Sequence, residues 1–299
     1  MATFNFLKEA QLYIVSGGLQ YNIDIESISF SQTFTDNSYS VKTLHDQDMF
    51  EGSVINTANP ANFEFKTFFL KESDLDIVID RLVDYNTFDL YISTQLDVFK
   101  LEYAVITNGS FVIEKSQPLS ITISGEASKL SKVGAAGSYT IPGTVQSRSA
   151  SRTFLRNTQQ TITLDGSDIS SEVYRISAEL QNEVDWDPYT TVHGAISATN
   201  AATSMFPSSF TVSKRILAGN IGRYVNSSNT DSLQDWSSNS SLVISVGEVI
   251  SSTLFGLQLN MPSCSFTNRL EVGPVYTQNY DWRLIDNTTA LSSIITKLT

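Results

Sequence analysis

Apolar and polar residues alternate along much of this chain. The clearest period-two stretches are residues 21–25, 28–32, 119–123 and 161–164. An extended strand turns successive side chains to opposite faces, so these stretches predict strands with one buried and one solvated face. Content of Phe, Tyr, Val, Ile and Thr predicts further strands at 63–69, 88–93, 99–106, 111–113, 210–213, 241–246, 253–259 and 275–282. The chain is therefore expected to be mainly β.

Helical periodicity is confined to short regions. The best is residues 73–85, where Leu75, Val78, Ile79 and Leu82 recur on one helical face and Ser73 can cap the start. A weaker pattern, interrupted by two glycines, predicts a second helix at 214–225. A third helix is expected near 289–298.

The order of features in the first half is repeated in the second. Ile28-Ser29 returns as Ile176-Ser177, at an offset of 148 residues. Further matches at offsets of 147 to 156 are Phe63 with Phe210, His45 with His193, Phe99 with Phe255 and Pro118 with Pro274. This run of similar offsets predicts an internal duplication. The alternative is two unrelated β domains whose patterns have converged.

A break in the strand pattern falls in the middle of the chain. Residues 131–157 contain a Gly/Ala-rich stretch and a Pro142-Gly143 turn signal, and their charged side chains are all basic. We interpret this segment as an exposed linker or arm. The resulting domains are 1–130 and 158–299, two tandem β-sandwich or barrel domains that each hold one helix and one long loop between strands.

Two long polar segments, 36–62 and 184–209, occupy matched places between matched strands. Both exceed the usual two to five residues of a hairpin loop, which is typical of a segment that makes contacts. The contact residues expected between subunits or between rings are Tyr39, His45, Phe50, Trp186, Tyr189, His193 and Phe206.

Composition narrows the function. The 299 residues carry 19 Lys and Arg against 31 Asp and Glu, a net charge of −12. A protein that binds DNA tightly needs a basic surface, so the acidic charge excludes tight DNA-binding proteins. No apolar run approaches the ~18–20 residues of a membrane helix, and no membrane partner is expected.

No catalytic motif is present. The chain has one cysteine, Cys264, and two histidines, and it lacks a nucleophile elbow, a phosphate-binding loop and a zinc-protease motif. The acidic stripe Asp76, Asp80 and Asp84 and the pair Asp185-x-Asp187 are interpreted as solvated carboxylates, because a calcium site needs several converging oxygens. The chain is expected not to be an enzyme and to hold no cofactor and no metal.

The first half is expected to contain paired strands (21–25 and 28–34), a long segment (36–62), a helix (73–85) and closing strands (99–106 and 119–125), and residues 160–285 repeat this order. This layout resembles the tail tube proteins of long-tailed bacteriophages and the related tubes of type VI secretion. The resemblance covers nearly the whole chain and lies in layout, without a sharp motif. It implies stacked rings of six domains whose sheets join into an inner barrel, so two domains per chain imply three chains per ring.

The resemblance also implies partners and location. The expected partners are other copies of the chain, a tape measure protein, a sheath if the tail is contractile, the baseplate, the tail terminator and genomic double-stranded DNA that passes through the lumen without tight binding. The expected location is the virion tail, assembled in the host cytoplasm. Two alternatives stay open: a baseplate, tube-initiator or hub protein of the same fold, and a tandem carbohydrate-binding module using Trp186, Tyr189, Trp236 and Tyr276.

Overall fold

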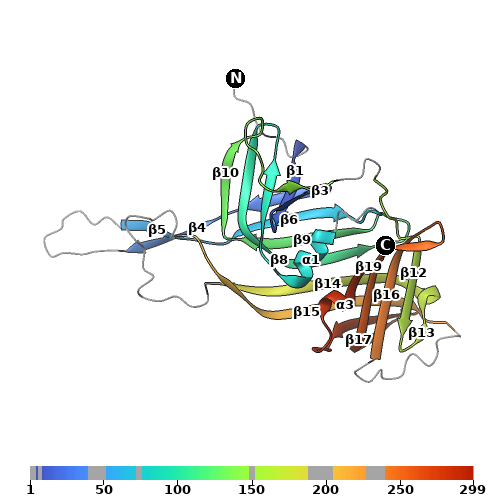
Figure 1. Cartoon of the computed structure of the whole chain (residues 1–299). Helices are drawn as coiled ribbons and strands as arrows, with labels where there is room; N and C mark the ends of the chain where they lie inside the picture. Colours follow the sequence, from blue (N-terminus) through green and yellow to red (C-terminus); the bar gives the residue numbers. More distant parts are fainter. Residues whose placement is uncertain are drawn as a thin grey trace.

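The computed structural model describes residues 5, 9–39, 52–71, 76–147, 152–187, 205–226 and 240–298. These residues are mainly β, as the alternation predicted, and few of them are helical (Figure 1). No described helix is both long enough and apolar enough to span a membrane. The core is apolar and runs through both halves of the chain, from Leu12 to Ile295.

The first half contains most of the short strands. They are β1 (Gln11–Ser16), β2 (Leu19–Ile23), β3 (Ile25–Ser31), β4 (Phe34–Tyr39), β5 (Gly52–Ala58), β6 (Ala61–Phe68), β7 (Phe88–Ser93), β8 (Asp97–Ile113), β9 (Ser120–Ala127), β10 (Lys129–Ala135) and β11 (Thr144–Val145). Among the described residues of this half, one α-helix occurs, α1 (Asp76–Asp84).

Strand β8 belongs to two layers of the first half. Residues 97–104 pair with β7 and β10, and β7 continues through β1 and β2 to β11. Residues 105–112 pair with β9, which continues through β6 to β3. Tyr103, which lies where the pairing changes, has a positive φ of 52°. The local backbone thus turns one long strand from the first layer into the second.

The second half contains fewer and longer strands. They are β12 (Gln159–Leu164), β13 (Ser167–Asp168), β14 (Val173–Trp186), β15 (Phe210–Tyr224), β16 (Ser240–Ile250), β17 (Thr253–Glu271), β18 (Thr277–Leu284) and β19 (Ile295–Leu298). A 3₁₀ turn (Ser170–Glu172) precedes β14, and the short helix α3 (Leu291–Ile294) precedes β19.

The pairings repeat from one half to the other. In the first layer, β17 lies between β16 and β19 as β8 lies between β7 and β10, and β16 continues to β12 and β13. In the second layer the order β3-β6-β9-β8 has its counterpart in β14-β15-β18-β17. Even an irregularity is repeated: a bulge lies between Ile25 and Ser27 in β3 and between Val173 and Arg175 in β14, again 148 residues apart. The described chain is one β layout used twice.

The register corrects two residue matches made from sequence. Rows that cross the second layer at equivalent places are Phe30-Phe63-Gly125-Ile106 and Ala178-Gly219-Trp282-Phe266. Phe63 therefore corresponds to Gly219, and its match with Phe210 was wrong. In the first layer, Ile92 pairs with Phe99 and Ile244 with Leu259, so Leu259 and not Phe255 is the counterpart of Phe99. Bulges and turns of unequal length shift the offset from strand to strand.

The helix predictions had mixed outcomes. Helix α1 lies within the predicted 73–85, while residues 72–75 are outside the described chain. The helix predicted at 214–225 was wrong, because this stretch lies in β15 and is paired on both sides by β14 and β18. Near the C-terminus, the single turn of α3 is followed by a strand. Long-range pairing here overrides a weak local helical pattern.

The segment between the halves is partly ordered against the first half. Residues 131–135 lie in β10, and β11 pairs in parallel with β2. Leu155 is fully buried, and its N–H donates to the Phe69 carbonyl at 2.9 Å. This part of 131–157 is therefore not an exposed arm, while the domain limits themselves stay a prediction.

Candidate assembly interfaces

The two halves of the chain meet edge to edge. Strand β8 of the first half pairs antiparallel with β14 of the second, from Ile113 opposite Ile176 to Asn108 opposite Gln181. This junction makes one continuous layer from the two four-stranded units (Figure 1). We call the β8–β14 pairing the internal junction. It joins the edge strand of the unit β3-β6-β9-β8 to the edge strand of the unit β14-β15-β18-β17.

Close packing of α1 strengthens the internal junction. Gly109 of β8 lies opposite Leu180, and a Cβ on this glycine would overlap the side chain of Leu82 in α1. On the other face of the layer, Asn108 Nδ2 donates to Glu179 Oε1 at 2.7 Å, across the junction. A residue without a side chain at Gly109 therefore lets the helix lie directly on the junction.

Two polar side chains of the second half bind the C-terminal end of α1. Asn182, 3% exposed, donates from Nδ2 to the Leu82 carbonyl at 3.2 Å and to the Ile106 carbonyl at 3.0 Å. Arg215 donates to the Val83 carbonyl at 2.6 Å and to Asn182 Oδ1 at 2.8 Å. Its guanidinium also lies over the ring of Tyr85 at 5.0 Å. A cation at a helix C-terminus meets carbonyls that have no helical partner, so this contact fixes α1 to the second half.

We call Asn182 and Arg215, which bind the end of α1, the helix latch. The sequence alone did not identify this pair. The signal was available for Asn182, which continues the buried positions Ile176, Ala178 and Leu180 of one strand. A polar residue on an apolar face needs hydrogen-bond partners. Burial lowers the pKa of Arg215, and electrostatic interactions with Tyr85 and Asp84 oppose this shift.

Each end of the joined layer is an edge with no described neighbour. Strand β3 pairs with β6 alone among the described strands, and residues 265–271 of β17 pair with β18 alone among them. Leu270, on the latter edge, is 43% exposed, whereas its counterpart Phe111 at the internal junction is 3% exposed. An open edge carries unpaired backbone donors and acceptors that can bind a further strand.

The layer has one polar face. Small polar residues and carboxylates alternate there with the buried positions of the strands, and hydrogen bonds from neighbouring strands hold the carboxylates. Ser124 Oγ donates to Glu64 at 3.3 Å, and Asn220 Nδ2 donates to Asp281 at 2.7 Å. This face therefore presents carboxylates held by hydrogen bonds, together with Lys66, Arg269 and Arg283 at alternate positions of the same strands.

Trp186 and Phe206, both expected to contact other subunits, lie at the far end of the β14–β15 hairpin and pack within the chain. Trp186 Nε1 donates to Glu126 Oε2 at 2.7 Å, and its ring packs on Phe210 at 5.3 Å. Phe206 contacts the Phe34 ring at 6.3 Å. Burial raises the pKa of Glu126, and the hydrogen bond from Trp186 opposes this shift.

The remaining expected contact residues give no structural test. Tyr39 is the last residue of β4, and only its backbone is described. His45, Phe50, Tyr189 and His193 lie outside the described residues. A role for all seven residues between subunits stays a prediction.

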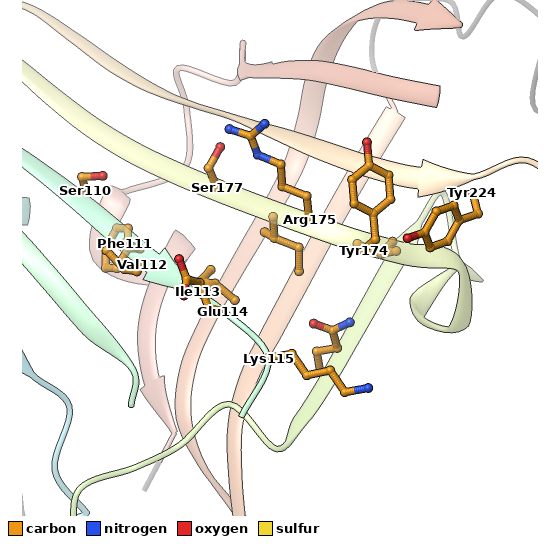
Figure 2. Close-up of a pocket in the computed structure, with 13 residues that line it drawn as sticks. Ser110, Phe111, Val112, Ile113, Glu114, Lys115, Tyr174, Arg175, Ser177 and Tyr224 are labelled. Carbon is orange, nitrogen blue, oxygen red and sulfur yellow. The ribbon is translucent and has the colours of Figure 1, made fainter. Parts of the chain in front are cut away.

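A hollow of about 680 Å³ lies beside the internal junction. It is lined by the end of β8 and the start of β14, and Figure 2 shows Tyr174 and Tyr224 side by side at one end. Their rings are 4.8 Å apart, and Tyr174 Oη donates to Asn279 Oδ1 at 3.1 Å. The lining includes the charged residues Glu114, Lys115 and Arg175.

In the described part of the chain, the Asp187 carboxylate and the Cys264 thiol hold positions within the fold. Asp187 accepts backbone N–H bonds from Ser208 and Ser209 and so closes the end of the β14–β15 hairpin. No group of three or more potential metal ligands occurs among the described residues. Cys264 is buried, and burial raises the pKa of its thiol to about 12.

A duplicated β layer whose two edges have no neighbour among the described strands defines the class of this protein as a tandem, mainly β protein. Comparison with family models finds a match over residues 78–295 to the Bacteriophage Baseplate Tube Protein Family. The chain therefore belongs to this family and is a structural protein of the phage tail or baseplate. It assembles with other tail or baseplate proteins.

Other comparisons add little. A search of curated proteins gave no match. Among solved structures, the chain is similar to a chain of the anti-feeding prophage baseplate, a cryo-EM structure symmetrised six-fold, with 13% identity, 45% of this chain and 98% of that chain covered, and a TM-score of 0.37.

Proposed function

We propose that this chain forms a ring of the tube at the baseplate end of a phage tail, with three chains in each ring. The observation that carries the proposal is the internal junction, which joins two equivalent units head to tail. The two edges that stay open, β3 and the end of β17, are the counterparts of β14 and β8, the strands that pair at this junction. Head-to-tail contacts that repeat around an axis close into a ring and leave no open edge. Six units from three chains would make such a ring pseudo-sixfold.

The polar face supports a conduit for DNA. Carboxylates at Glu64, Glu179 and Asp281 are held in place by neighbouring side chains. The whole chain carries a net charge of −12. Because acidic residues outnumber basic ones in the chain, a lumen lined by this protein would repel phosphates and let DNA pass without being bound. In this proposal the protein has no catalytic role.

Rings at this station need neighbours along the tail axis. We propose that the chain contacts further rings of the tube, the tape measure protein and the remaining baseplate, and a sheath if the tail contracts. The family match favours a baseplate ring over the body of the tail tube, with which the sequence has its resemblance. Assembly would take place in the host cytoplasm.

Mass and shape of the purified chain test the proposal. Sedimentation and negative-stain microscopy over a range of concentrations are expected to give particles of three times 33.0 kDa, or stacks of them, with six lobes around a hole. Immunogold labelling of virions is expected to mark the baseplate end of the tail. A chain that stays monomeric at every concentration and gives no label on virions would refute the proposal.

A further inference from the structure

We infer that residues 267–271 of β17 pair with residues 29–33, the end of β3 and the two residues after it, of a second copy of this chain in the register of the internal junction. The inference rests on the proposed ring and goes further, because it assigns the surface and the residue pairs. The two edges are the counterparts of the two strands that already pair inside the chain, β8 with β17 and β14 with β3.

Equivalent rows across the layer fix these counterparts. The rows are Ile25-Thr67-Ile121-Phe111 in the first half and Val173-Arg223-Gln278-Leu270 in the second. The first residue of each row borders the matched bulge, which removes the freedom to slide one copy along the other. Leu270 is therefore the counterpart of Phe111, and Phe30 is the counterpart of Ala178.

The register between two chains follows from these matches. At the internal junction, Phe111 lies opposite Ala178 and Val112 lies opposite Ser177. Between chains, Leu270 is then expected opposite Phe30, and Glu271 opposite Ser29. A shift by one residue would turn the buried positions of one strand to the polar face, so the apolar pattern favours this register.

Exposed apolar side chains at the end of β17 indicate that this edge lacks a neighbouring strand. Leu270 is 43% exposed and Val272, just beyond the strand, is 73% exposed, whereas Phe111 at the matched place is 3% exposed with β14 beside it. Phe30 is only partly buried and packs against the core beside the open edge of β3. A second copy would cover both side chains with the contact that the chain already makes within itself.

Paired cysteines test the register. We choose the double variants Ser29→Cys/Glu271→Cys and Phe30→Cys/Leu270→Cys, because one of two adjacent antiparallel pairs is non-hydrogen-bonded and brings its Cβ atoms close enough for a disulfide. The matched control is Ser31→Cys/Glu271→Cys, displaced by two residues on the same face. Native Cys264 is buried and is kept in every variant.

Oxidation of concentrated protein, followed by non-reducing electrophoresis, is expected to link one chosen pair into dimers and closed trimers, at least tenfold more than the control. Circular dichroism identifies any variant that fails to fold, and the surface pair 29/271 serves if Phe30→Cys does so. Rings that form in microscopy without this cross-link, or with the displaced pair linked equally, would overturn the register and leave the ring intact. A wild-type chain that never forms rings would overturn both.

Discussion

The indole of Trp282 occupies the space above Gly219, where a Cβ would stand 2.6 Å from Cζ2. The first half reverses the sizes at the matched pair: the ring of Phe63 covers Gly125. The two copies thus fill the same part of the layer with one large and one absent side chain, contributed by opposite strands. This compensation preserves packing while the sequences differ.

Gly219→Ala is expected to destabilise the fold, because its Cβ would also overlap the carbonyl oxygen of Ser177, which cannot move without the strand. Overpacking of this kind costs about 1–3 kcal/mol. Urea unfolding of the purified chain measures the change. Gly137→Ala is the control, since nothing lies within 4 Å of its added Cβ. Equal unfolding midpoints for the two variants would contradict the packing described.

Arg215→Ala is expected to release α1 from the second half. The carbonyl of Val83 loses its charged donor and Asn182 loses a partner, at a cost of about 1.5–3 kcal/mol. Hydrogen exchange of the α1 amides should quicken more than that of the β16 amides. Arg156→Ala removes an exposed pair with Glu248 at 3.5 Å and should cost at most about 0.5 kcal/mol. The helix latch would be refuted if both variants affected α1 equally.

Glu126 makes stability depend on pH. Because burial raises its pKa above the ordinary value of 4.5, the folded chain binds more protons than the unfolded chain just above that pH. Stability from this group therefore falls as pH rises from about 4.5 through the folded pKa. Glu126→Gln keeps an oxygen for Trp186 and should flatten this part of the profile in urea titrations from pH 4 to 8.

Trp186→Phe provides the opposite change at the same site. It removes the N–H that donates to Glu126 at 2.7 Å and leaves the partly buried carboxyl without this stabilising partner. The decline in stability with rising pH should then become steeper, by about 1 kcal/mol at neutral pH for this partly exposed group. A steeper profile for Glu126→Gln than for Trp186→Phe would refute the assignment.

Cys264 is expected to resist thiol reagents in the native protein. With its pKa at about 12, little thiolate forms at pH 8, and the side chain is 0% exposed. The rate with an aromatic disulfide reagent should be at least a hundredfold lower than in denaturant. Rapid native labelling would show that β17 opens at this residue, because Cys264 lies between Ser240 and Leu284 in the sheet.

Local pattern predicted many of the strands and part of the helical structure, and it missed β1, β10 and β14. Residues 28–32 and 119–123 alternate because one face of each strand is buried, and this follows from neighbours in the sequence. The stretch 214–225 has apolar spacing compatible with a helix, yet β14 and β18 pair with it on both sides. Asn182 and Arg215 could not be assigned to α1 from sequence, because they meet Leu82 and Val83 only after the halves join.

The sequence by itself determined that the chain is mainly β and that its layout occurs twice, since strand alternation and the return of Ile28-Ser29 as Ile176-Ser177 are local features. Only the tertiary structure decided which residues are counterparts, because bulges and turns change the offset along the chain. It also decided that β8 pairs with β14 and that β3 and the end of β17 have no described partner beyond β6 and β18. Pairing between distant strands depends on backbone hydrogen bonds available to any residue, so side-chain patterns do not encode which edges meet.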